Sequence, residues 1–237
     1  MEKEGHERLV KRMNARISRH ILGTFEAAMT SLRTNVLMMA SLTQRNLQNS
    51  LIGLTQRENQ PCTTVIADDE EIDALEVQID RDGTETMMRF NPVASDMREV
   101  LATMKLSVHL ERIADQAVGI ARRVIQLNSV PSVPEVIATH EMFCHATNMF
   151  VDALQAFANR NIELALALRS RDRRLDDMNK EIAEKLSDTM LRDVFRVRTY
   201  LNLIFIARYI ERIGDHSTNI AEDTVFLISA LDIRHQN

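Results

Sequence analysis

Glycine, proline and aromatic residues are scarce in this chain of 237 residues. It has six glycines and four prolines, and its aromatic fraction is 4%. Alanine, leucine, methionine, arginine and glutamate are plentiful instead. This composition favours long helices over sheets.

Other features that the sequence lacks exclude several classes of protein. The two cysteines, Cys62 and Cys144, form no paired motif, so nothing indicates disulfides or a thiolate metal site. No uncharged run exceeds about eleven residues, whereas a transmembrane helix needs roughly 20 apolar residues. The N-terminal sequence MEKEGHERLVKRM lacks the apolar core of a signal peptide. We therefore expect a soluble, cytoplasmic protein.

The chain also lacks an excess of positive charge. Its formal net charge is -5 and its isoelectric point is about 5.8. A general nucleic-acid binder needs a basic face to displace counterions, so we expect no nucleic-acid partner.

A tandem duplication is the main feature that is present. The sequence ERIADQAVGIA at residues 111–121 returns as ERIGDHSTNIA at residues 211–221, with six of eleven positions identical. A second pair, DEEIDALEVQI from Asp69 and DRRLDDMNKEI from Asp172, repeats with an offset of 103 rather than 100 residues. We expect the three-residue slip to lie in a loop. The chain thus reads as two similar units of about 100 residues.

Helical spacing of apolar residues predicts three helices in each unit. They cover residues 20–56, 62–89 and 92–127 in the first unit, and 135–159, 162–191 and 192–231 in the second. Pro92 is expected in the first turn of the third helix, where proline is tolerated. The resulting organisation is a polar segment at 1–14, one unit at 15–127, a linker NSVPSVP at 128–134, and a second unit at 135–237.

The third helix of each unit carries an apolar stripe that we expect to be buried. The stripe comprises Leu203, Ile206, Ile210, Ile213, Ser217, Ile220 and Ala221 in the second unit, and Thr103, Leu106, Leu110, Ile113, Ala117, Ile120 and Ala121 in the first. Amphipathic helices joined by short loops form antiparallel bundles. The predicted fold is all-α, a tandem repeat of two antiparallel three-helix bundles.

Acidic residues form rows beside these stripes. Residues four apart stack one turn above the other on a helix. The third helices carry Glu111 and Asp115 in one unit and Glu211 and Asp215 in the other, with Arg122 where the second unit has Glu222; the second helices carry Asp69, Asp73, Glu76 and Asp80, and Asp172, Asp176 and Asn179.

Two interpretations of the rows stay open. Acidic residues on an amphipathic helix commonly face water, and with neighbours such as Arg112 and Arg212 they can form surface ion pairs. Like charges at this spacing are mutually destabilising, however, and the pairing recurs at corresponding places in both units. A shared cation would relieve the repulsion. Carboxylates suit Mg²⁺, Mn²⁺ and Ca²⁺, and carboxylate clusters also bind iron.

Other candidate ligands have weaker support. His20 and His140 precede or begin the first helix of each unit, where surface or capping roles are common. His216 follows Asp215 in the second unit only, because the first unit has Gln116 there. Arg98 and Arg198 stand thirteen residues before the motif glutamates and could hold an anion or form an interhelical ion pair. We favour the ion pair.

The segments ERIAD and ERIGD, the pairs Asp69 with Asp73 and Asp172 with Asp176, and the stretch NPVASDMREVLATMKLSVHLERIAD together resemble the PhoU family of phosphate-signalling regulators. The resemblance covers residues 15–230. It implies a cytoplasmic, often dimeric, all-helical protein that acts by contact with the ATPase of a Pst-type phosphate ABC transporter and with a membrane sensor histidine kinase. Such a protein restrains phosphate uptake and represses the phosphate-starvation (Pho) regulon.

The resemblance also implies metal, with iron, zinc, manganese or magnesium reported across the family. Carried over by position, the ligands are Asp69, Asp73, Glu111 and Asp115 in one unit, and Asp172, Asp176, Glu211 and Asp215 in the other. The second unit departs from the first at Asn179 and Ala183, so the two sites are expected to differ. No catalytic residues are implied, and the membrane is reached only through protein partners.

A carboxylate-bridged metalloenzyme, either a metal-dependent phosphohydrolase or an oxidase, is the alternative from another class. A ferritin-like site needs Glu-x-x-His pairs on facing helices, and the sequence contains none. No glycine-rich phosphate loop is found either. A helical scaffold without metal would leave the acidic rows unexplained.

Overall fold

The computed structural model describes residues 2–233, with side chains described for residues 23–233. Six α-helices follow one another, and the described residues contain no strand. The helices are α1 (Glu2–Gln56), α2 (Asn59–Phe90), α3 (Ser95–Asn128), α4 (Val136–Asn159), α5 (Ile162–Arg192) and α6 (Val197–Ser229), and a 3₁₀ turn (Val194–Arg196) precedes α6. The predicted all-α fold is confirmed.

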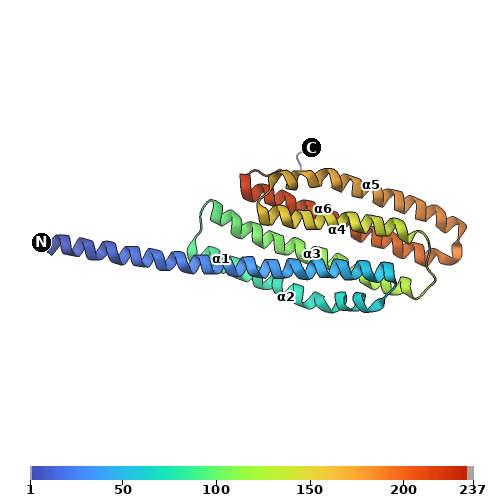
Figure 1. Cartoon of the computed structure of the whole chain (residues 1–237), viewed down its shortest axis with the longest axis horizontal. Coiled ribbons are helices and arrows are strands. Elements are labelled where there is room, and N and C mark those ends of the chain that lie inside the picture. The colour runs from blue at the N-terminus through green and yellow to red at the C-terminus, as the bar shows by residue number, and fades with distance from the viewer. Residues whose placement is uncertain (1, 234–237) are drawn as a thin grey trace.

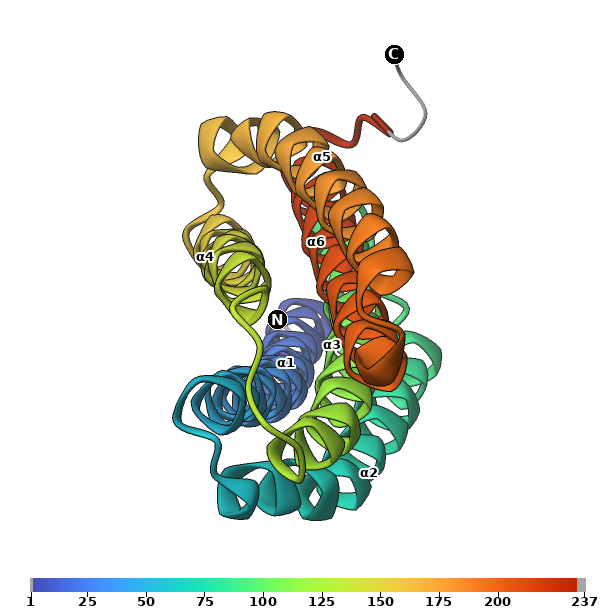
Figure 2. The same cartoon turned by 90° about the vertical axis from the view of Figure 1, so that its right-hand side faces the viewer.

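The helices form two antiparallel three-helix bundles that lie side by side (Figures 1 and 2). Helices α1, α2 and α3 pack against one another in the first bundle, and α4, α5 and α6 do so in the second. The bundles meet mainly through α3 and α6, and less extensively through α1 and α4. The acidic rows of each bundle lie on its second and third helices, α2 and α3 in the first bundle and α5 and α6 in the second.

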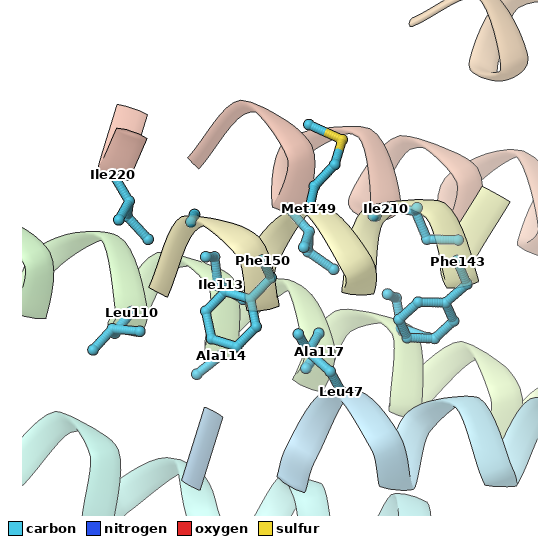
Figure 3. Packing of buried hydrophobic residues seen from close by; sticks show 14 of the residues in the cluster. Leu47, Leu110, Ile113, Ala114, Ala117, Phe143, Met149, Phe150, Ile210 and Ile220 are labelled. Carbon is cyan, nitrogen blue, oxygen red and sulfur yellow. The ribbon is translucent and has the colours of Figure 1, made fainter. Parts of the chain in front are cut away.

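The apolar stripes on α3 and α6 are buried as predicted. Every residue of both stripes is buried, including the small polar Thr103 and Ser217. Side chains from all six helices join one hydrophobic cluster. Figure 3 shows Phe143 and Phe150 of α4 beside residues of α3 and Leu47 of α1. The core is thus continuous between the bundles, which holds the acidic rows of both bundles in one body.

Glycine permits close helix approach at two points of this arrangement. A Cβ atom on Gly119 of α3 would lie 2.9 Å from the ring of Tyr209 on α6. A Cβ atom on Gly214, within the ERIGD motif, would lie 2.2 Å from Leu175 Cδ2 on α5. Real Cβ contacts are not this short, so each glycine lets a large side chain pack directly on the backbone.

Several predicted boundaries were wrong. Helix α1 begins at Glu2 rather than near residue 20, and it extends well beyond the bundle (Figure 1). Pro92 lies before α3, which begins at Ser95. The turns at 91–94 and 193–196 have equal length, so the three-residue slip between the repeats is not in the loop. It is absorbed by shorter helix ends in the second bundle. No helix within residues 2–233 is both long and apolar enough to cross a membrane.

Candidate metal centre

The acidic rows of α2 and α3 converge in the first bundle. Asp69 has a raised pKa because its carboxyl is partly buried and because Asp73 and Asp115 lie near it, while Arg122 opposes the shift. Asp73 is on the same helix, whereas Asp115 is on α3. The two helices therefore bring their carboxylates into one electrostatic neighbourhood, as expected from stripes that face a common core.

Glu111 has the carboxyl with the largest pKa shift in the first bundle. Burial raises its pKa to about 7, and the charge of Asp115 adds to the shift while Arg112 opposes it. Arg112 Nε lies 3.2 Å from Glu111 Oε2 and its Nη1 lies 3.6 Å from Asp115 Oδ2. The geometry at Glu111 Oε2 is not that of a hydrogen bond, because this buried oxygen has no donor among the described residues. The single guanidinium of Arg112 thus compensates the negative charge of Glu111 and Asp115 only in part.

The second bundle repeats the arrangement with α5 and α6. Burial raises the pKa of Asp172 to about 6, and Asp215 and Asp176 contribute further repulsion. Burial also raises the pKa of Glu211, together with Asp215, against the opposing charge of Arg208. Arg208 bonds one oxygen of Glu211, but Glu211 Oε2 and Asp172 Oδ1 are buried without a donor among the described residues.

The tightest acidic group of the described residues lies here. One carboxylate oxygen from each of Asp176, Glu211 and Asp215 lies within 4.8 Å of the others. Three carboxylates at this separation repel one another in water and more strongly when partly buried. A cation that ligates these three carboxylates would relieve their repulsion.

The donor set fits a metal that prefers oxygen. Mg²⁺, Mn²⁺ and Ca²⁺ bind carboxylates, and iron binds clusters of them. Among the described residues, three of the predicted ligands come within ligating distance of one another, Asp176, Glu211 and Asp215 of the second bundle. The other predicted ligands are linked to their acidic neighbours by pKa shifts without forming such a group in the described part of the chain, Asp172 in the second bundle and Asp69, Asp73, Glu111 and Asp115 in the first. That they bind metal stays a prediction.

The two centres are not equivalent. Arg122 contributes positive charge near Asp69 in the first bundle. The corresponding residue of the second bundle, Glu222, lies 3.1 Å from Arg169. The first centre also contains Glu76, whose pKa is raised by partial burial, where the second has Asn179. We expect different affinities for the same cation.

The two arginines singled out in the sequence have other surroundings. Arg98 Nε donates to the backbone carbonyl of Leu227 at 3.2 Å. It therefore joins α3 to α6, though through a carbonyl rather than through the acidic partner that we favoured. Arg198 is exposed, and no ion pair of Arg198 is found among residues 23–233.

The contacts of the histidines differ from those that the sequence indicated. The side chain of His20 lies outside the described residues. His140 Nε2 lies 3.5 Å from Cys144 Sγ one turn away. His216, which seemed to lack a counterpart, faces His109 of the other bundle, with 3.4 Å between their Nδ1 atoms. Sequence reasoning missed this pair because its members occupy non-equivalent positions of the repeats, 107 residues apart.

Comparison with known proteins agrees with this geometry. The family model described as the PhoU domain matches the chain twice, at residues 36–124 and 139–224. The two matches contain the two acidic centres, one in each.

Curated relatives match over nearly the whole chain. The Escherichia coli (strain K12) protein named "Phosphate-specific transport system accessory protein PhoU" is 30% identical over 92% of this chain and 91% of its own length. The homolog from Zymomonas mobilis is 34% identical over 87% of both chains.

Solved structures share the fold. The crystal structure of PhoU from Pseudomonas aeruginosa superposes with a TM-score of 0.85 at 30% identity, covering 87% of this chain and all of that one (100%). The phosphate transport system regulatory protein PhoU from Streptococcus pneumoniae superposes with a TM-score of 0.75 at 22% identity, over 88% of this chain and 98% of its own.

Proposed function

The chain belongs to the PhoU family, and from this premise we propose that it is an accessory protein of a phosphate-specific transport system. In the proposed role it represses phosphate uptake and the phosphate-starvation regulon. It does so as an adaptor between the ATPase of a Pst-type transporter and a membrane sensor histidine kinase. The observation that carries this proposal is the match of the family model to both repeats, with full-length relatives named as accessory proteins.

We assign the protein no catalytic activity of its own. The carboxyls with strongly raised pKa values include Glu111 of α3 and Asp172 of α5, and arginines form ion pairs with Asp115 and Glu211 in the same two rows of acidic groups. Such a set suits cation binding, and relatives bear the name of accessory proteins rather than of enzymes. The alternative function is that of a carboxylate-bridged metalloenzyme. A measurement of phosphohydrolase turnover distinguishes it from an adaptor.

The acidic centres are proposed to hold a divalent metal or a multinuclear cluster of iron, zinc, manganese or magnesium. Asp176, Glu211 and Asp215, whose oxygens lie within 4.8 Å of one another, would hold it in the second bundle. Bound metal supplies positive charge that lets α5 and α6 keep their carboxylates ionised and close together. The shape of each bundle then depends on its metal content.

The partners and location follow from the same proposal. The protein would be a cytoplasmic homodimer that meets the membrane through the transporter ATPase and the kinase. Both bundles belong to one body with a continuous core, so one chain can offer a surface of each bundle to a different partner. This is what an adaptor between two partners requires.

Affinity purification of the tagged full-length chain from cells grown in high phosphate tests the contacts. Both the transporter ATPase and the sensor kinase should be recovered with it. A Glu211→Ala variant should show whether the metal centre supports the contacts, and Glu181→Ala on the exposed side of α5 is the matched control. Recovery of neither partner under any phosphate supply would contradict the adaptor role. Phosphohydrolase turnover that is lost in Glu211→Ala but kept in Glu181→Ala would establish the enzyme instead.

A further inference from the structure

Helices α3 and α6 cross between the two bundles, and residues contact each other on two sides of this crossing. Because α3 and α6 are repeats of each other, each residue on one side has an equivalent residue on the other side. On one side the contact is closed: Tyr209 packs on Gly119, and Arg123 Cζ stacks 3.9 Å from the ring centroid of Phe205. Arg123 also donates to Asn202 at 2.9 Å. Aromatic rings and a guanidinium pack together on this side, although Phe205 stays 45% exposed.

The other side carries different residues at the equivalent positions. With the 100-residue offset, His109 replaces Tyr209, Lys105 replaces Phe205, Asp223 replaces Arg123 and Asn219 replaces Gly119. This side opens into a cavity of about 710 Å³, lined by these four side chains among others. One side of the interface is therefore packed with aromatic rings, and the equivalent side carries polar and charged side chains.

Two imidazoles face each other on the polar side. The Nδ1 atoms of His109 and His216 are 3.4 Å apart. A good hydrogen bond to nitrogen has about 2.7–3.2 Å between its heavy atoms, so this separation is long for one. Two nitrogens that each lie about 2.0–2.1 Å from a tetrahedral ion are roughly 3.3–3.4 Å apart, which matches it.

The second ring nitrogen of His109 faces a carboxylate. Its Nε2 lies 3.3 Å from Asp223 Oδ2, and the other oxygen of Asp223 accepts from Lys105 Nζ at 2.7 Å. When Nε2 donates its proton to this carboxylate, Nδ1 carries a free lone pair directed toward His216. A carboxylate that holds the second nitrogen is the usual companion of a metal-bound histidine.

We propose that His109 and His216 bind one divalent transition-metal ion and so link the two bundles across α3 and α6. The ion is of the class that imidazole favours, Zn²⁺, Cu²⁺ or Ni²⁺. Because χ2 is a broad torsion in histidine, the two rings can rotate to aim both Nδ1 atoms at one point. Water in the adjoining cavity completes the coordination. The donors of this site are nitrogens from both bundles rather than carboxylates, and the proposal does not rest on the proposed function. The adjoining cavity is also lined by Asp172 and Asp215 of the second acidic centre.

Electron paramagnetic resonance of the wild-type protein with one equivalent of Cu²⁺ tests the donor set directly. The expected spectrum shows superhyperfine coupling to two imidazole nitrogens. His109→Gln and His216→Gln should each lose the two-nitrogen pattern. His145→Gln is the matched control, because its ring contacts the carbonyl of Arg171 instead. A wild-type spectrum with no nitrogen coupling would refute the site even if a variant failed to fold.

Calorimetric titration with Zn²⁺ supplies a second readout. Each of the two glutamine variants should lose one bound Zn²⁺ per chain while binding Mn²⁺ like wild type. Asp223→Asn keeps both imidazoles and should weaken Zn²⁺ binding about tenfold, as loss of an outer-shell carboxylate does. Unchanged Zn²⁺ stoichiometry and affinity in His109→Gln and His216→Gln would mean that the two rings are only a hydrogen-bonded contact.

Discussion

Replacing Asp172 by asparagine removes one negative charge from the centre between α5 and α6 and leaves its shape unchanged. Asp172 Oδ1 is buried without a donor among the described residues. Its pKa is raised from 3.8 to about 6 by burial and by Asp215 and Asp176. The ionised form is therefore less stable in the folded protein than in the unfolded chain.

The sign of the pH dependence follows from this shift. A carboxyl with a raised pKa binds its proton more tightly in the folded state, so it favours folding at low pH. That contribution is present below the ordinary pKa of 3.8 and is lost as the pH rises toward about 6. Each unit of pKa corresponds to about 1.4 kcal/mol, which sets an upper limit of ~3 kcal/mol. Partial exposure and solvent screening reduce the expected effect to ~1 kcal/mol.

Asp172→Asn should consequently be more stable than wild type at pH 8 without metal. The expected rise in melting temperature is roughly 2–4 °C for a chain of this size. At pH 4 the two proteins should melt together, because the wild-type carboxyl is then largely protonated. Asp177→Asn, an exposed neighbour on the same helix, is the control and should leave the melting temperature unchanged at both pH values.

Metal should reverse the order of thermal stability, so that wild type becomes more stable than Asp172→Asn. A ligand that binds only the folded state at 100 times its Kd adds about 2.7 kcal/mol of stability. Wild type should gain more from Mn²⁺ at pH 8 than Asp172→Asn does, since it retains the full set of carboxylates. Thermal melts of both proteins with and without Mn²⁺ measure this. A less stable Asp172→Asn in metal-free buffer at pH 8, with equal responses to Mn²⁺, would refute the reasoning.

Three further substitutions probe the packing that positions the centres. Gly214→Ala should lower the free energy of unfolding by ~1–3 kcal/mol through overpacking against Leu175, because the new Cβ would lie 2.2 Å from Leu175 Cδ2; a thermal melt measures it, and full stability would contradict the close approach. Arg57→Ala should cost about 1–3 kcal/mol in urea unfolding, since Arg57 donates to three carbonyls at the end of α3 and in the linker. Arg123→Ala should cost ~1 kcal/mol by removing the cation from the ring of Phe205, whereas Arg123→Lys should recover part of the loss.

Local signals in the sequence predicted much of the fold and the positions of the acidic rows. The stripes from Thr103 to Ala121 and from Leu203 to Ala221 predicted the buried faces because helical periodicity is a short-range pattern. Asp69 lies near Asp115 because the rows on the two neighbouring helices both flank a stripe that faces one core.

Features that depend on how the bundles pack could not be predicted in this way. Nothing in the repeat indicates that α3 and α6 cross so that Gly119 receives Tyr209. The approach of His109 to His216 depends on this crossing, because the two residues occupy different positions of their repeats. The start of α1 was misplaced because residues before 20 carry few of the apolar positions on which the prediction depended.

The most direct test of the proposed function is reporter expression from a phosphate-starvation promoter in a deletion strain grown with abundant phosphate. The account predicts that the promoter, which is repressed in the parent strain, is expressed in the deletion strain. Repression should return with the wild-type chain supplied in trans. Normal repression in the deletion strain under high phosphate would contradict the account.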